Sequence, residues 1–151
     1  MSDTFTIFNE VIADLADDEL DWLAETEQLL YESSDWPSWA RAAISVDPED
    51  ILYPLVDIDR PHHRVRIYSD DNASPVAVVP LVQGFLRRFY PGSSFSLSWA
   101  SGSTRPGPGE LGGGALLITA DAVSRIDTWS WIERHGRDLI NAAASTADVA
   151  A

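Results

Sequence analysis

Cysteine and lysine do not occur among the 151 residues of the sequence. Without cysteine the chain can form neither a disulfide nor a thiolate zinc site, and redox chemistry at a thiol is excluded. Without lysine there is no phosphate-binding loop of the Walker A type. The G-x-S-x-G motif that presents a nucleophilic serine is also missing. The sequence therefore lends little support to an enzyme of any of these classes.

Long apolar segments are missing as well. The longest one, residues 75–86, is interrupted by Pro80, Gln83 and Gly84, whereas a membrane helix needs about 20 apolar residues in a row. Residues 1–4 carry neither the positive charge nor the apolar segment of a secretory signal. We therefore expect a cytoplasmic protein that does not associate with a membrane.

Charge is distributed unevenly along the chain. Residues 1–71 contain 18 acidic residues and 4 arginines, a net charge of −14, while residues 72–151 contain 6 of each and are neutral. The use of arginine alone fits either the codon usage of a GC-rich genome or a salt-adapted host. Nucleic-acid phosphates are bound by clustered lysine and arginine. Direct binding to nucleic acid is therefore not expected.

The composition is that of a folded protein. Hydrophobic residues make up 45% of the chain and aromatic residues 10%, which supplies the apolar surface that offsets the entropy of the chain. A chain of this length fits one domain. We expect a single domain over residues 1–143 and a flexible C-terminal tail over residues 144–151.

Apolar alternation and helical spacing predict elements in the order βαββαββα. Strand pairs between helices favour the α+β class, with a mainly antiparallel sheet of about five strands and three helices packed on it. The expected strands cover residues 4–12, 52–57, 65–69, 94–100 and 115–119, and the expected helices cover residues 17–33, 76–89 and 127–143.

Two details of the expected helices carry predictions. Pro80 removes a hydrogen bond from a helix interior, so the second long helix either begins near Val79 or kinks there. A short helical turn is expected over residues 39–44. The first helix has a stripe at helical spacing that we expect to be buried, formed by Trp22, Leu23, Thr26, Leu29, Leu30 and Ser33.

A glycine- and proline-rich segment, residues 101–114, follows the fourth expected strand. It contains the dinucleotide pattern G-x-G-x-x-G, but that pattern must open a helix and here a strand follows. We interpret the segment as a long β–β connection whose glycines permit close backbone approach. Connections of this length are often functional. The candidate binding residues at this loop are Trp99, Arg105, Glu110, Gly112, Gly113 and Gly114.

His62 and His63 lie among acidic residues such as Asp57 and Asp59, an arrangement that invites comparison with a metal site. Adjacent residues of an extended chain point to opposite faces, and neither H-E-x-x-H nor the calcium-loop spacing occurs. We therefore expect a solvated acidic turn here, and no metal ion or other cofactor.

The first expected helix carries an acidic face, and no basic residue precedes Arg41. Like charges four residues apart, as at Asp17 and Asp21, cost a helix about 0.2–0.5 kcal/mol per pair. A face kept this acidic indicates either a contact surface for a basic protein partner, in the extreme case a mimic of DNA, or an adaptation to solubility or salt. The residues of this candidate acidic face are Asp17, Asp21, Glu25, Glu32 and Asp35.

Four segments carry a family resemblance: the LVQGFLRRF helix at 81–89, the strand at 95–100 that ends in Trp-Ala, the Gly-Gly-Gly-Ala run within 111–120, and the helix start at 127–132. Together they resemble an uncharacterised family of bacterial and phage-encoded proteins. The family often has Cys-Ser-Lys-Pro-Arg after the Trp-Ala pair, where this chain has Gly-Ser-Thr-Arg-Pro. A role of that thiol or lysine therefore could not operate here. The resemblance implies one domain, without a known activity.

Two function hypotheses follow. We favour a non-catalytic binding or interaction protein, whose contact surface is either the acidic helix or the region from Trp99 to Gly114. The resemblance adds a setting in phages or mobile elements. The alternative is a small-ligand-binding protein or enzyme that uses loop 101–114, with a pocket lined by Trp99, Arg105 and Glu110. The sequence does not predict the oligomeric state.

Overall fold

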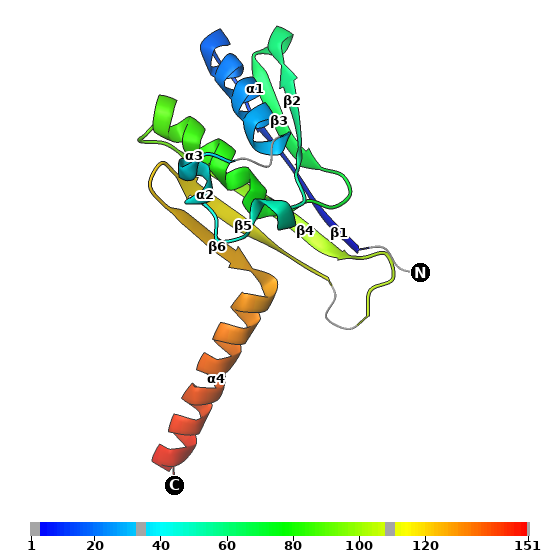
Figure 1. The fold of residues 1–151 in the computed structure, drawn as a ribbon. Coiled ribbons are helices and arrows are strands. Elements are labelled where there is room, and N and C mark those ends of the chain that lie inside the picture. The colour runs from blue at the N-terminus through cyan, green and yellow to red at the C-terminus, as the bar shows by residue number, and fades with distance from the viewer. Residues whose placement is uncertain (1–3, 33–35, 108–110, 151) are drawn as a thin grey trace.

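The computed structural model describes residues 4–32, 36–107 and 111–150, and the side chains of those residues except 146–150 (Figure 1). Single 3-10 turns lie at Pro48–Asp50, Arg60–His62 and Pro75–Ala77. The strands are β1 (Thr4–Ile12), β2 (Leu55–Asp59), β3 (Arg64–Ser69), β4 (Ser94–Ser103), β5 (Gly112–Thr119) and β6 (Val123–Asp127), and the helices are α1 (Asp17–Tyr31), α2 (Ser38–Arg41), α3 (Val78–Phe89) and α4 (Thr128–Ala150).

The described strands form one antiparallel sheet of six strands in the order β2-β3-β1-β4-β5-β6. The expected α+β class and antiparallel sheet are confirmed. The sheet has one strand more than expected, because residues 123–127 form β6 after a tight turn in which the Thr119 amide donates to the Ala122 carbonyl at 2.8 Å. The sequence did not predict β6, because the strand has only five residues and Arg125 at its centre weakens the apolar alternation.

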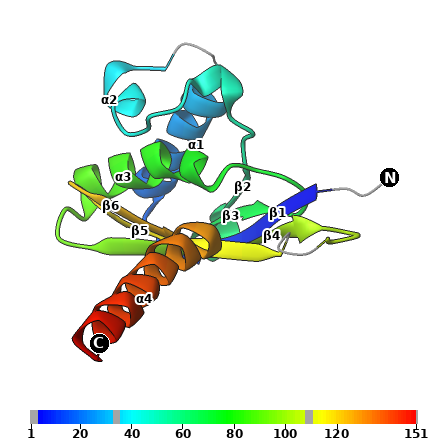
Figure 2. The same cartoon turned by 90° about the horizontal axis from the view of Figure 1, so that it is seen from below.

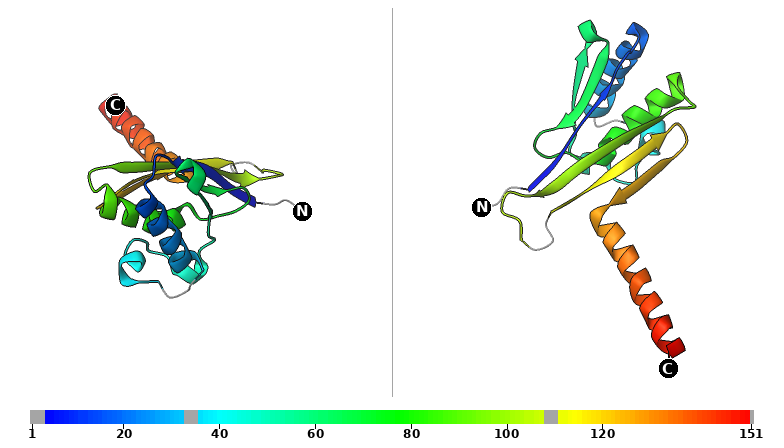
Figure 3. Two further views of the ribbon diagram at one scale, coloured as in Figure 1. Left: turned by 90° about the horizontal axis from the view of Figure 1, so that it is seen from above. Right: turned by 180° about the vertical axis from the view of Figure 1, so that it is seen from behind.

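The sheet separates α1, α2 and α3 on one face from α4 on the other, as Figures 2 and 3 show. The core lies between the sheet and the first three helices. Its large, fully buried aliphatic side chains are Leu20, Leu23, Leu30, Val65, Ile67, Val78, Leu81, Val82, Leu97, Leu116 and Ile118.

The helix α1 buries a narrower stripe than expected. Leu23, Thr26 and Leu30 are buried and Trp22 packs edge-on against Phe89 of α3, but Leu29 is 43% exposed. The prediction for Leu29 was wrong, because α1 packs on α3 and β2 along one side and Leu29 lies beyond that contact. Ser33 lies outside the described residues.

The α3 helix accommodates Pro80 without a kink. A 3-10 turn at Pro75–Ala77 precedes the helix, so Pro80 is its third residue. In the first helical turn the backbone amide has no partner within the helix, and its loss therefore costs little. Two side chains of α3 bond to the end of β5. Gln83 Nε2 donates to the Thr119 carbonyl at 3.1 Å, and Arg87 Nη2 donates to the Ala120 carbonyl at 3.0 Å.

The last helix, α4, continues to Ala150 instead of ending near Ala143. The residues that follow Asn141 begin with three alanines, which have the highest helix propensity of all residues. The helix therefore includes most of the segment expected as a C-terminal tail. It projects away from the body of the domain (Figure 1).

Candidate functional site

Both ends of the expected loop 101–114 are strand, since residues 101–103 belong to β4 and residues 112–114 to β5. Ser101 pairs with Gly112, Ala100 with Gly113 and Trp99 with Gly114 in the β4–β5 ladder. The connection between the two strands thus spans only residues 104–111. The expected close approach of the backbone at the glycines is present. The connection is six residues shorter than expected, since glycine disfavours a strand on propensity but Gly113 and Gly114 here meet a close neighbour that leaves no room for a side chain.

That neighbour is Trp99. A Cβ built on Gly114 would collide with the indole atom Cζ2 and lie 2.7 Å from Cη2, and a Cβ on Gly113 would collide with the Trp99 carbonyl oxygen. The Arg125 guanidinium lies 5.5 Å from the centre of the same ring. The glycines therefore serve the packing of β4 against β5, a structural role that is independent of any ligand.

The remaining loop candidates lie apart from that contact. Arg105 is exposed after the end of β4, where its amide donates to Ser103 Oγ at 3.4 Å. Gly112 lies against Thr128, whose Oγ1 would be 3.4 Å from a Cβ at that position. Glu110 lies outside the described residues, so its pairing with Arg105 stays a prediction.

On the acidic face, Asp17, Asp21 and Glu25 are exposed on α1, and Glu32 is exposed at its C-cap. Asp35 lies outside the described residues. The turn between β2 and β3 brings positive charge to this face. Arg60 Nη1 lies 2.8 Å from Asp21 Oδ1, an ion pair between two half-exposed side chains. Sequence spacing on the helix could not show this contact, because the two residues are 39 positions apart.

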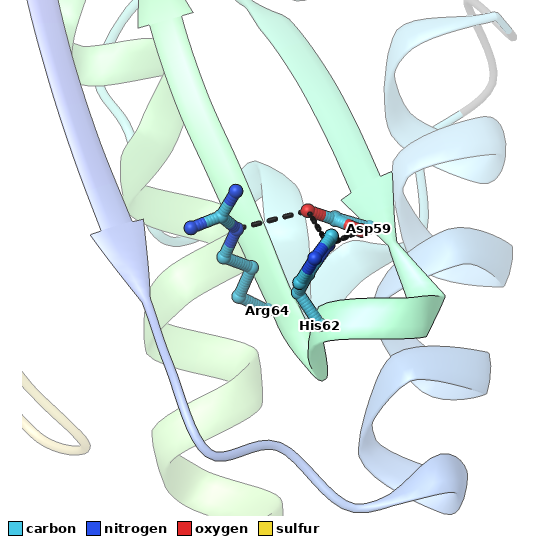
Figure 4. A network of polar contacts seen from close by, with 3 residues as sticks. All are labelled: Asp59, His62 and Arg64. Carbon is cyan, nitrogen blue, oxygen red and sulfur yellow. Dashed lines mark hydrogen bonds and ion pairs between the residues drawn. The ribbon is translucent and has the colours of Figure 1, made fainter.

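The two histidines of the β2–β3 turn approach different carboxylates, and His63 Nδ1 lies 4.0 Å from Asp17 Oδ1 of α1. His63 adopts a left-handed conformation with φ of 51°, whereas His62 Nδ1 lies 2.9 Å from Asp59 Oδ1 (Figure 4). Arg64 Nε donates to Asp59 Oδ2 at 2.9 Å. The hydrogen bond from His62, then that from Arg64, holds the pKa of Asp59 below its usual range. Within the described ranges, no three His, Asp or Glu side chains are placed to share a metal ion.

The junction of β6 and α4 has no linker residue, since β6 ends at Asp127 and α4 begins at Thr128. Thr128 Oγ1 accepts a hydrogen bond from the Gly113 amide at 3.0 Å and donates to the Gly113 carbonyl at 3.1 Å. Asp127 caps the helix by accepting from the Ser130 amide at 2.9 Å. This bond, with a further one from the Ser130 hydroxyl, lowers the pKa of Asp127. These contacts fix the direction in which α4 leaves the sheet.

The apolar side of α4 is largely uncovered. Leu139 is 72% and Ile140 69% exposed, and Trp129, Trp131 and Ile132 are about half exposed. At 3.6 residues per turn, these side chains share one half of the helix circumference with Ala142 and Ala143. The opposite half carries Glu133, Arg134, Arg137, Asp138 and Asn141. An amphipathic helix of this kind normally has its apolar half against protein.

The sheet face on the α4 side, here called the outer sheet face, is uncovered as well. Alternation along the strands places Ile7, Val11, Leu117 and Ile126 on it, all between 40% and 52% exposed. Between Ile7 and Ile126 the face is floored by small residues of β4 and β5, namely Ser98, Ala100, Gly113 and Ala115.

Two shallow hollows flank this floor. One, of about 420 Å³, lies at the base of α4 between Gly113, Ile126, Trp131 and Ile132. The other, of about 630 Å³, includes Ile7, Asn9, Ser98 and Ala100 over β1 and β4. The sequence had predicted the helix and the strands of this surface except β6, which carries Ile126. It did not reveal that nothing else in the described chain covers them.

Comparison with protein-family models, with curated proteins and with solved structures gave no match. Among the described residues, no helix is both long and apolar enough to cross a membrane. The interpretation of the candidate surfaces therefore depends on their own geometry.

Proposed function

We propose that this protein is a non-catalytic interaction protein that binds another polypeptide over the outer sheet face and the apolar side of α4. One observation carries the proposal. Both surfaces of a potential apolar contact, the sheet face around Ile126 and the helix face around Leu139, are exposed on adjoining parts of the same chain. Folded monomers rarely expose apolar patches larger than a few hundred Å², and larger ones mark interaction sites.

The chemistry of the hollows supports binding over catalysis. Their lining is mostly apolar or small, and the polar groups at the base of α4 are already engaged. Asp127 caps α4, and the Thr128 hydroxyl is bonded to both polar groups of the Gly113 backbone. A side chain that both accepts and donates within the fold is poorly placed to act as an acid or base.

A second candidate surface is the acidic face of α1, which would bind a basic protein partner. The observation that favours it is the exposure of Asp17, Glu25 and Glu32 along one side of the helix. Arg60 neutralises only the Asp21 position. The reading as an adaptation to solubility or salt stays open. The third possibility, a ligand site at loop 101–114, draws less support because Gly112, Gly113 and Gly114 are part of β5.

Affinity co-purification from the natural host at low and raised salt tests the proposal. Four tagged forms are compared: wild type, Ile126→Asp on the outer sheet face, Leu29→Asp on α1 as its control, and Glu25→Gln on α1. The control adds the same charge at an exposed apolar residue on the other side of the sheet. We expect a partner that survives raised salt and is lost only with Ile126→Asp. Salt screens exposed ion pairs, so loss with salt and with Glu25→Gln would assign the contact to the acidic face. If a partner is captured equally by wild type and by all three substituted forms, the proposal is refuted.

A further inference from the structure

The α4 helix cannot cover the outer sheet face of its own chain. It starts in the residue after β6, and the two hydrogen bonds between Thr128 and Gly113 hold its first turn against β5. From there it leads away from the sheet (Figure 3). Folding it back would require breaking those bonds and the Asp127 cap. Among the described residues, both apolar surfaces are therefore left without an intramolecular partner.

The total surface supports the same view. The chain exposes 9282 Å², whereas a compact monomer of 16.6 kDa exposes about 7,600 Å². The excess, roughly 1,700 Å² for one chain, is larger than the about 800 Å² that each partner buries in a standard protein–protein interface. A chain with this much additional surface, much of it apolar, is shaped for association.

We infer that the partner on this surface is a second copy of the chain, with α4 of each copy lying on the outer sheet face of the other. The inference rests on the proposed function, since it names the occupant of the same surface. The shapes are complementary, because the large side chains of α4 at Trp131, Ile132 and Leu139 would face a floor made of Ser98, Ala100, Gly113 and Ala115.

The area decides between a reciprocal and a one-way contact. A 23-residue helix is about 35 Å long and about 10 Å wide, so it would cover roughly 350 Å² of a sheet and bury a similar area of its own. One such contact would bury about 700 Å² in total, which is less than stable interfaces bury. Two related by a two-fold axis would bury about 1,400 Å², within the range of stable dimers. Reciprocal exchange also leaves no apolar helix unpaired.

Charge does not oppose this dimer. The acidic face of α1 lies on the other side of the sheet from α4 (Figure 2), so the two most negative surfaces would point outward. On the outer sheet face itself, Arg66 and Arg64 pair in register with Asp57 and Asp59 of β2. The surfaces that meet are thus close to neutral, although each chain carries a net charge of −14.

Sedimentation equilibrium of the full chain across a range of concentrations tests the inference. We expect a species of about 33 kDa, twice the chain mass of 16.6 kDa. Leu139→Asp should weaken association by about tenfold or more. Leu139 is 72% exposed in one chain, so the substitution should leave folding intact. Asn141→Asp, which adds the same charge on the polar side of α4, should leave the mass unchanged.

A cross-linking experiment locates the contact, and the cysteine-free sequence makes it clean. Ala115→Cys and Leu139→Cys chains are mixed and treated with a short bis-maleimide. We expect a linked pair of the two different chains. Glu25→Cys on α1 replaces Leu139→Cys in the control, which should give no cross-link to Ala115→Cys.

A mass of 16.6 kDa at every concentration, with no link between Ala115→Cys and Leu139→Cys, would overturn the inference. A dimer insensitive to Leu139→Asp would overturn it too, because another surface would then hold the copies together. The proposed function is judged separately. If the chain is a monomer and captures a host protein through Ile126, the proposed function stands and only the dimer is refuted. If it is a monomer and captures nothing through Ile126, both the proposed function and the dimer are refuted.

Discussion

Trp99 on β4 lies directly opposite Gly114 on β5, and its indole occupies the space that a side chain at Gly114 would need. This contact gives a physical reason for the Trp-Ala and Gly-Gly-Gly-Ala segments to occur together. A tryptophan that lies across a neighbouring strand requires a residue without a Cβ beneath it. The two segments are one packing unit divided between two strands.

Gly114→Ala should destabilise the fold by about 1–3 kcal/mol, the usual cost of adding a methyl group to a filled site. The new Cβ would meet Trp99 and also the Ile126 carbonyl oxygen at 2.5 Å. Urea denaturation measures the change in the free energy of unfolding. Gly92→Ala is the control, since a Cβ there meets nothing within 4 Å. Equal stability of Gly114→Ala and wild type would show that the indole lies elsewhere.

Gly136→Ala should have the opposite sign. Gly136 lies inside α4 and a Cβ there meets nothing within 4 Å. Alanine should stabilise the helix by about 0.5–1 kcal/mol, because glycine loses more backbone entropy in a helix. Circular dichroism should show more helix and a thermal transition with a higher midpoint temperature. A loss of helix would mean that the segment is not helical in solution.

Thr128→Val should loosen the junction of β6 and α4. The valine keeps the shape of the threonine but removes two hydrogen bonds to Gly113, each worth about 0.5–1.5 kcal/mol. Hydrogen exchange at the Gly113 amide should accelerate. Ser124→Ala, at an exposed position of β6, should leave that exchange rate as it is. An unchanged rate in Thr128→Val would disprove the role assigned to this hydroxyl.

Stability should depend on pH through Asp59. Hydrogen bonds from His62 and Arg64 keep its pKa in the folded protein below the unfolded value, which is near 3.9. A lowered pKa contributes stability above the unfolded value, and this is lost as the pH falls through the folded value. Asp59→Asn should therefore destabilise the fold at neutral pH and converge with wild type in acid. A difference in stability between Asp59→Asn and wild type that persists in strong acid would contradict this assignment. Asp57→Asn, which removes the same charge from another residue of β2, is the control.

The fold was largely predictable where local pattern decides the structure. The β-branched and aromatic residues at 4–12 predicted both ends of β1, and the acidic first turn predicted the start of α1 at Asp17. Pattern failed where a contact between distant residues decides. Gly113 and Gly114 lie in β5 where Trp99 leaves no room for a side chain, and Arg125 lies within β6 near the same indole ring.

The candidate surface was harder to predict, for the same reason. The amphipathic pattern of α4 is present in the sequence and normally means a buried helix face. Whether that face meets its own sheet depends on the direction of the helix, which Thr128 and Gly113 set across 15 residues. No periodicity encodes that direction. The acidic face was predicted from α1 alone, whereas the ion pair between Arg60 and Asp21 could not be predicted from helical spacing.

Hydroxyl-radical footprinting of the wild-type chain below and above its association concentration tests the central claim most directly. The account predicts that Leu139 on α4 and Ile126 on β6 become protected together as the concentration rises. Leu29, exposed on α1 at the far side of the sheet, should react equally at all concentrations. Reactivity of Leu139 and Ile126 that never changes would contradict the account, because it would leave both apolar surfaces facing water.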